Sequence, residues 1–167
     1  TITVTQSGLS DVDFGFNFST VVNTNNSGQG SLNQFILNNN ELANTNLDQE
    51  DNPTNGVAFP KSTGWETSIF MIPSTGDPLG RTADANFANG YFTITMSNSD
   101  IFPVVTGVNS VIDGRTQTAY SGNTNAGSVG SGGTGVGISN TSLPNFDRPE
   151  IELYRPGGDV LQLNGTN

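Results

Sequence analysis

The side chains of this chain that could do acid–base chemistry are carboxylates, because the sequence contains no His and no Cys. Mechanisms that depend on a His base or a Cys nucleophile are therefore excluded. Glu150 and Glu152 are the best-spaced pair. On one strand, their side chains would share a face about 6–7 Å apart, a separation that glycosidases use. A like-charged row on an outer strand face is much commoner than an active site, so we expect no enzymatic activity.

Two further pairs combine a carboxylate with an arginine. Asp113 and Arg115 fall on one predicted turn, and Asp147 and Arg148 fall on another. Polysaccharide lyases and hydrolases that are built on a parallel β-helix typically need Arg or Lys near a row of Asp, so these pairs keep a carbohydrate-active protein open as an alternative. Turn residues and surface ion pairs explain both of them more simply.

One acidic stretch raises the question of a metal site. Asp48, Glu50 and Asp51 lie close together in a polar, turn-rich segment. A calcium loop needs alternating oxygen ligands and a Gly at its sharp turn, in something close to the spacing of an EF-hand, and this stretch lacks that spacing. We expect a solvated loop here and no cofactor, with calcium as the less favoured alternative.

The elements that would position these side chains are mostly strands and turns, with one helix between residues 20 and 44. Gly28 and Gly30 loosen the backbone ahead of this helix, and Ser31 followed three residues later by Gln34 makes a capping box. We therefore expect the helix to start at Ser31. Its apolar side chains recur with helical spacing, which predicts that it covers an apolar surface: Leu32, Phe35, Ile36, Leu42 and Ala43.

Short runs of strand-forming residues alternate with turn residues along the rest of the chain. Such spacing is expected of a parallel β-helix and equally of a β-sandwich. In the last run, Ile151 and Leu153 should point inward, which would put Glu150, Glu152 and Tyr154 on the outer face. The runs are Ser68–Ile72, Tyr91–Met96, Phe102–Thr106, Ser110–Ile112 and Glu150–Tyr154.

The stretch VVNTNNSGQGSLNQFIL, residues 21–37, is similar to the entry segment of bacterial surface proteins that carry a right-handed parallel β-helix. In that pattern a short strand, a Gly-rich turn and a GSLRQAI-like helix open the solenoid, and this chain has Asn33 where Arg is usual. The resemblance continues through residues 66–73, 110–117 and 145–153. It implies an all-β fold, a short right-handed parallel β-helix with an N-terminal capping α-helix and preceding strands. It brings no catalytic motif.

The N-terminal residues are predicted to stand apart from the rest of the chain. Residues 1–19 are expected to form strands that resemble the end of the small β-sandwich repeats often found before such a solenoid, and residues 20–167 the capped β-helix. Two short strands cannot bury an aromatic row by themselves, so we expect this segment to pack on the solenoid or to join the sheet of another molecule. The row consists of Val12, Phe14, Phe16 and Phe18.

The C-terminal residues are predicted to form the complementary surface. Val160–Leu163 starts another coil, and the sequence stops four residues later at Asn167. A coil that ends without a polar cap is exposed, so either the chain was longer or this end docks on the next subunit. Head-to-tail contact that does not close gives filaments. The predicted assembly interface comprises Val12, Phe14, Phe16, Phe18, Val160, Leu161 and Leu163.

Composition limits the classes of partner. The net charge of −10 leaves no basic stripe for the phosphates of nucleic acid, and it disfavours an anionic membrane surface. No apolar run approaches the roughly 20 residues that span a membrane. An acidic chain rich in Asn, Thr and Gly suits an extracellular or cell-surface protein. The sequence begins at Thr1 without Met, so we expect a processed protein or a piece of a longer one.

The function that these observations favour is structural. We expect a secreted or surface-displayed module of a fibre, matrix or adhesin, whose partners are other copies of itself or a larger surface protein. The alternative is a carbohydrate-binding or carbohydrate-active β-helix protein with polysaccharide as its partner. That alternative requires Trp65, Tyr91 and Tyr154 to gather near Glu150 and Glu152, because oligosaccharide grooves usually offer stacked aromatics beside carboxylates.

Overall fold

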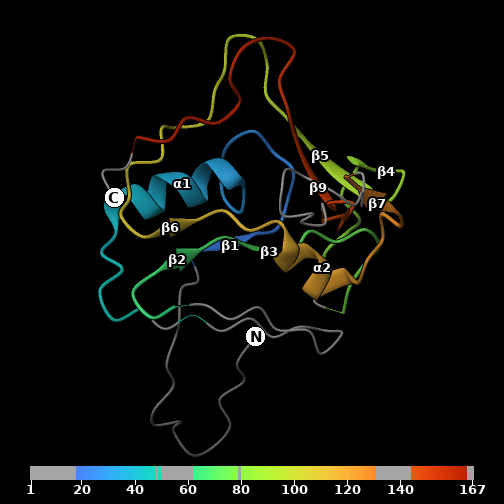
Figure 1. Ribbon diagram of the computed structural model, residues 1–167, viewed down its shortest axis with the longest axis horizontal. Helices are drawn as coiled ribbons and strands as arrows, with labels where there is room; N and C mark the ends of the chain where they lie inside the picture. The colour runs from blue at the N-terminus through green and yellow to red at the C-terminus, as the bar shows by residue number, and fades with distance from the viewer. Residues whose placement is uncertain (1–17, 48, 50–61, 79, 131–143, 165–167) are drawn as a thin grey trace, which may run out of the picture.

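The computed structural model describes residues 18–47, 49, 62–78, 80–130 and 144–164 (Figure 1). Two helices and nine short strands follow one another in the order β1, α1, β2 to β6, α2, β7 to β9. Their bounds are β1 Thr20–Val21, α1 Leu32–Glu41, β2 Glu66–Thr67, β3 Ile69–Phe70, β4 Phe87–Ala88, β5 Tyr91–Thr95, β6 Ser110–Val111, α2 Arg115–Ser121, β7 Ser128–Val129, β8 Phe146–Asp147 and β9 Ile151–Tyr154.

The strands form four separate small sheets. β1 pairs with β3 and β2 pairs with β6, both in parallel. The largest sheet has the order β4, β5, β9, in which β4 and β5 are antiparallel and β5 and β9 are parallel. β7 and β8 form an antiparallel pair, and a single parallel bridge joins Val105 to Leu163.

The prediction of an all-β, short right-handed parallel β-helix is wrong. A solenoid needs strands that stack coil upon coil into continuous sheets, whereas here the described strands make sheets of two or three that mix parallel and antiparallel pairing. The run Phe102–Thr106 contributes only the isolated bridge at Val105. A second helix, α2, which the sequence did not predict, follows the predicted turn at Asp113 and Gly114.

Helix α2 takes the place of a strand beside β3. Phe70 N–H donates to Thr116 Oγ1 at 2.8 Å, and Ile72 N–H donates to Gln117 Oε1 at 2.9 Å. Gln117 Nε2 in turn donates to the Ile72 carbonyl at 3.0 Å. Two side chains of the helix therefore satisfy the strand edge that a neighbouring strand would otherwise pair, so the ladder ends there.

Helix α1 lies across the molecule above β1 and β6 (Figure 1). Its N-cap is Ser31, whose Oγ accepts a hydrogen bond from the Gln34 backbone N–H at 3.2 Å. The Gln34 side chain does not return the bond to Ser31, as a full capping box would require, but donates to Asn38 Oδ1 at 2.8 Å. The helix ends one residue before Leu42, which is exposed.

The hydrophobic core lies between α1 and the strands. Its buried members come from α1, β1, β3, β5 and the segment after β5, and a partly buried layer packs against them. Burial of this apolar surface is the main force that holds the short sheets together, at roughly 25 cal/mol per Å². The core residues are Val21, Leu32, Phe35, Ile36, Phe70, Ile72, Phe92, Ile94, Met96, Phe102 and Val105, and the outer layer is Phe87, Ile112, Ile151, Leu153, Val160 and Leu161.

Candidate functional site

The two glutamates with glycosidase-like spacing do not form a catalytic pair. Glu150 lies just before β9 and is buried, with 3% of its surface exposed, whereas Glu152 is exposed on β9. Thr118 Oγ1 of α2 donates to Glu150 Oε2, and Thr93 Oγ1 of β5 donates to Glu152 Oε2 at 3.0 Å. The expectation of a shared outer face is wrong, because Glu150 precedes the strand and its carboxylate lies against α2.

The carboxylate–arginine pairs are local. Arg115 donates from Nε to Asp113 Oδ1 at 2.9 Å and from one terminal nitrogen to Asp113 Oδ2 at 2.7 Å, and 71% of its side chain is exposed. Asp147 and Arg148, at the end of β8, are both exposed. These positions agree with a turn ion pair and with surface charges.

Arg81 forms a third cluster, which the sequence did not indicate, and protein groups accept its hydrogen bonds. Arg81 donates to Asp77 Oδ2, to the Met71 carbonyl at 2.7 Å and to the Tyr120 hydroxyl at 2.8 Å. Burial raises the pKa of Asp77, but its hydrogen bonds and charge interaction with Arg81 bring that pKa below the ordinary value. Burial also raises the pKa of Tyr120. The Arg81 guanidinium bonds to protein acceptors, so this cluster holds the loop between β3 and β4 against α2.

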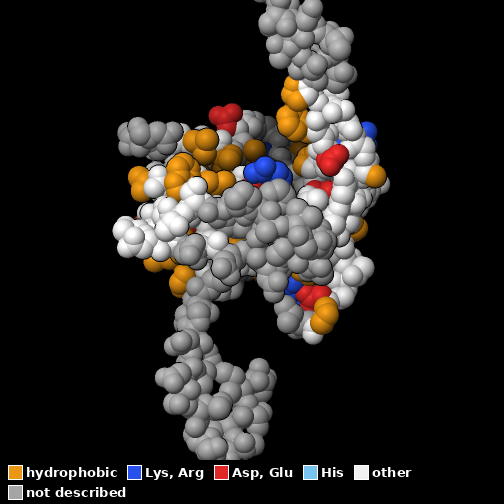
Figure 2. Space-filling model, turned by 60° about the horizontal axis from the view of Figure 1, so that its bottom comes forward, with side chains coloured by type: hydrophobic (Ala, Val, Ile, Leu, Met, Phe, Trp, Pro, Cys, Tyr) orange, Lys and Arg blue, Asp and Glu red, His pale blue; other side chains and the backbone are white. Residues whose placement is uncertain are grey.

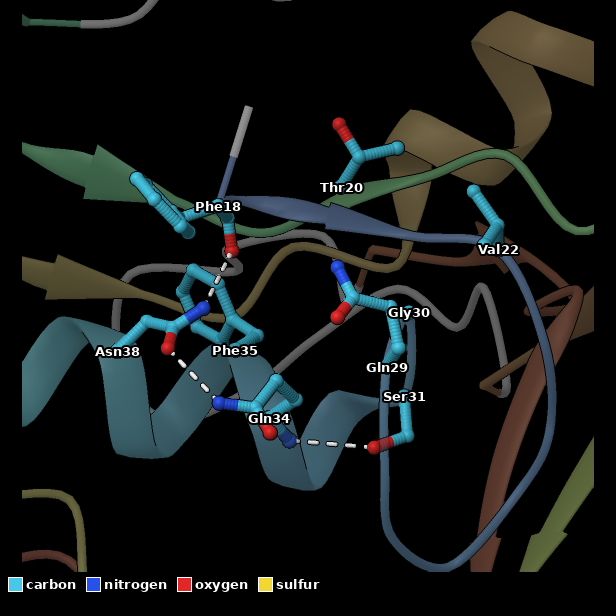
Figure 3. A pocket seen from close by; sticks show the side chains of 9 residues that line it. All are labelled: Phe18, Thr20, Val22, Gln29, Gly30, Ser31, Gln34, Phe35 and Asn38. Atoms are coloured by element: carbon cyan, nitrogen blue, oxygen red, sulfur yellow. Dashed lines mark hydrogen bonds between the residues drawn. The ribbon is translucent and has the colours of Figure 1, made fainter. Parts of the chain in front are cut away.

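A groove that the sequence did not predict lies between β1 and the first turns of α1 (Figure 3). Gly30 makes it possible, with φ of 75° and a backbone so close to Val22 that an added Cβ would lie 2.5 Å from Val22 Cγ2. The Gly30 carbonyl accepts from Val22 N–H at 2.8 Å, which holds the loop against β1. The lining is Phe18, Thr20, Val22, Gln29, Gly30, Ser31, Gln34, Phe35 and Asn38.

The groove is small and partly apolar. Its volume is about 170 Å³, comparable with engineered cavities that hold one benzene ring. Phe35 is buried along it, and Phe18 stands beside it with 47% of its surface exposed. Asn38 Nδ2 donates to the Phe18 carbonyl at 3.4 Å, a long hydrogen bond that joins the two walls. The groove could take one aromatic or aliphatic side chain, and no titratable group lines it.

The outer edge of β9 is the second surface with unused bonding capacity. Phe92 N–H donates to the Glu150 carbonyl and Met96 N–H donates to the Tyr154 carbonyl, both as part of the pairing with β5. In a parallel ladder, alternate residues direct their backbone groups to opposite sides, so the N–H and C=O groups of Ile151 and Leu153 point away from β5. Within the described part of the chain these four groups have no hydrogen-bond partner. We call them the β9 edge.

The residues predicted to form the assembly interface are not gathered in one place. Val12, Phe14 and Phe16 lie outside the described residues, and Phe18 stands beside the β1–α1 groove. At the other end of the chain, Leu163 is exposed at 74% and bridges Val105, while two residues pack half-buried against the core. Those two are Val160 and Leu161, so the predicted C-terminal end is less open than the sequence suggested.

The aromatic residues required for a sugar groove are divided. Tyr91 and Tyr154 lie on the outer face of the β5–β9 sheet, because their strand neighbours Phe92 and Leu153 turn toward the core. Trp65 directly precedes β2, in a different sheet. On the face drawn in Figure 2, acidic side chains are scattered rather than clustered. The arrangement therefore offers a flat tyrosine face and not the predicted groove with two carboxylates.

No family model, curated protein or solved structure matches this chain. The resemblance to β-helical surface proteins therefore stays a prediction. Among the described residues, no three His, Cys, Asp or Glu side chains gather where they could hold a metal ion. The carboxylates considered for calcium, Asp48, Glu50 and Asp51, lie outside those residues. None of the described helices is long and apolar enough to cross a membrane.

Proposed function

We propose that the chain is an extracellular structural module, part of a cell-surface fibre, matrix or adhesin, and that copies of it associate through β-strand contacts. The observation that carries this proposal is the β9 edge. Uncovered strand edges are the usual templates for adding a strand from another chain, and folded proteins that stay monomeric normally cover, charge or shorten them. Neither Ile151 nor Leu153 is charged, and β9 is four residues long.

Two further observations support a structural role rather than a catalytic one. Of the described charged residues that sequence spacing singled out, Arg115 pairs with Asp113, and Glu150 and Glu152 are separated between the interior and the surface. Large apolar side chains that a monomer would normally bury are exposed, Phe18 and Leu163 among them. Exposed apolar surface favours protein–protein contact.

The proposal is tested by the mass and shape of the full chain. Light scattering with negative-stain microscopy at neutral pH should show oligomers or filaments whose mass grows with protein concentration. A version lacking Thr1–Phe18 should stay monomeric, because it lacks the alternating aromatic row. If the full chain is a monodisperse monomer throughout the concentration range, self-association is wrong.

The tyrosine face supports a second candidate, carbohydrate binding without catalysis. Tyr91, Glu152 and Tyr154 share one outer sheet face, and the hydrogen bond from Thr93 holds the Glu152 carboxylate there. Aromatic rings beside polar groups suit the stacking and hydrogen bonding that sugars need. A polysaccharide array read with the wild-type chain and with the Tyr154→Ala variant tests this candidate, and loss of a specific signal in the variant would support it.

A further inference from the structure

The β9 edge is bounded by an incompletely covered part of the core. Ile151 and Leu153 are only partly buried, and so is Ile112, which belongs to the same outer layer. Gly114, next in chain to the ion-paired Asp113, lies against Ile151, where an added Cβ would be 3.7 Å from Ile151 Cβ. A strand that added to this edge would therefore gain hydrogen bonds and cover apolar side chains at once.

The charges around the edge are more nearly balanced than those of the chain as a whole. The chain has only five cationic residues, and three of them adjoin β9: Arg148 precedes it, Arg155 follows it directly, and Arg115 adjoins Gly114. Carboxylates lie beside them, since Arg115 is paired with Asp113 and the strand region itself carries Asp147, Glu150 and Glu152. A strand carrying carboxylates at its end would meet less repulsion here than on most of a chain whose net charge is −10.

One segment of this sequence has the required properties. Residues 11–18 read DVDFGFNF, with an apolar residue at every second position and with Asp11 and Asp13 at the N-terminal end. Alternation places the apolar side chains on one face of an extended strand, where they could cover the partly buried layer. The segment contains no cation and no Pro, so each of its residues keeps a backbone donor. The Phe18 carbonyl is already hydrogen-bonded to Asn38 of α1 in its own molecule, so we call residues 11–17 the donor strand.

We infer that the β9 edge is the acceptor for the donor strand of a second copy of this chain. This inference rests on the proposed self-association and identifies its two halves. Each copy then carries one donor and one acceptor, so the contact is heterologous and propagates into a filament unless the rotation between copies closes a ring. The C-terminal residues Val160–Leu163, which the sequence suggested as the complementary end, are replaced in this role by Ile151–Tyr154.

The acceptor can be blocked without breaking the sheet. Because the Leu153 N–H points away from β5, a proline there removes a donor from the free edge only, as prolines on edge strands do. The matched control is Leu153→Ala, which shortens the same side chain but keeps the N–H. The donor is blocked by the double change Phe14→Asp and Phe16→Asp, which puts charge on its apolar face. Far-UV circular dichroism of each full-length variant shows whether it is folded.

Sedimentation velocity of the variants alone and mixed decides the inference. We expect L153P and the donor double variant each to stay monomeric, with association weakened by at least about tenfold, and L153A, which keeps the edge N–H, to associate more tightly than L153P. An equimolar mixture of L153P and the donor double variant should give a dimer and nothing larger, since only one intact donor and one intact acceptor remain per pair. If this mixture stays monomeric while the wild type associates, the inference is wrong and the proposed function stands.

A competition experiment covers the case in which L153P does not fold. A synthetic peptide of residues 11–17 is added to the associated full-length chain, with a peptide carrying Asp at positions 14 and 16 as control. Loss of oligomers with the first peptide alone supports the inference. Oligomers that persist with both peptides overturn it, and a wild-type chain that never associates overturns the proposed function itself.

Discussion

Replacing Gln117 with Leu should destabilise the fold more than any comparable change of a surface glutamine. The Gln117 side chain is fully buried, and it pairs with both backbone groups of Ile72, accepting from the N–H at 2.9 Å and donating to the carbonyl at 3.0 Å. Ile72 is itself fully buried. A leucine of similar size fills the space but leaves that N–H and that carbonyl without partners and away from water.

The magnitude follows from the two lost partners. A buried backbone group left unpaired costs about 1–3 kcal/mol, so the two groups together cost about 2–6 kcal/mol. Leu buries more apolar surface than the amide did and offsets about 1 kcal/mol of this. We therefore expect the free energy of unfolding to fall by about 3 kcal/mol, a large part of the 5–15 kcal/mol that is typical of folded domains.

Urea unfolding followed by far-UV circular dichroism measures this loss, with the slope of the transition as the check that both variants unfold from a similar structure. The matched control is Gln34→Leu on α1, whose side chain bonds only to the Asn38 side chain and should change stability by no more than about 0.5 kcal/mol. A loss below about 1 kcal/mol for Q117L would refute the view that α2 replaces a strand beside β3.

Three further changes have defined outcomes. Gly30→Ala should lower the free energy of unfolding by about 1–3 kcal/mol more than Gly28→Ala in thermal or urea unfolding, because both have positive φ but only Gly30 has its Cβ space filled. Ser31→Ala should lower the free energy of unfolding by about 1 kcal/mol in the same assay, because the N-cap hydrogen bond is lost, and a clearly larger loss would contradict a purely local role. Burial raises the pKa of Glu66, so the folded state binds its proton more tightly than the unfolded state does. Stability then falls as the pH rises from the ordinary Glu value of 4.5 through the raised pKa, and Glu66→Gln should be more stable than wild type at neutral pH, with a gap that closes in acid.

Helix α1 was predictable because its signals are local. Ser31 at the N-cap and the spacing of Leu32, Phe35 and Ile36 lie within one short stretch, and the structure begins the helix at Leu32. The C-terminal end of α1 was less well defined by the sequence, since the Asn-rich turn before Leu42 has weak helix propensity.

Helix α2 was not predictable in the same way. Its sequence RTQTAYS lacks an apolar stripe, and the cap at Gly114 makes no side-chain hydrogen bond. What holds it is tertiary: Thr116 and Gln117 bond to the backbone of β3 and of Ile72, residues more than 40 positions away. Sequence periodicity cannot report such contacts, so the sequence predicts a turn at Asp113 and Arg115 and no helix after it.

The candidate sites show the same difference between local signals, which the sequence carries, and tertiary contacts, which it does not. Residue spacing placed Glu150 and Glu152 on one face, and burial beside Thr118 separated them. The β9 edge is defined by which neighbours a strand lacks, a property that appears only once the pairing of β5 and β9 is known. Alternation of apolar residues in the last strand, by contrast, was local, and Ile151 and Leu153 do pack against the core.

Amide hydrogen exchange of the full chain at rising protein concentration tests strand-edge association most directly. The N–H groups of Glu152 and Tyr154 face β5 and should exchange slowly at every concentration. The N–H groups of Ile151 and Leu153 lie on the β9 edge, and we predict that they become protected only as the chain associates. If the chain associates while these two amides keep exchanging as fast as they do in dilute solution, the contact lies elsewhere and the account is contradicted.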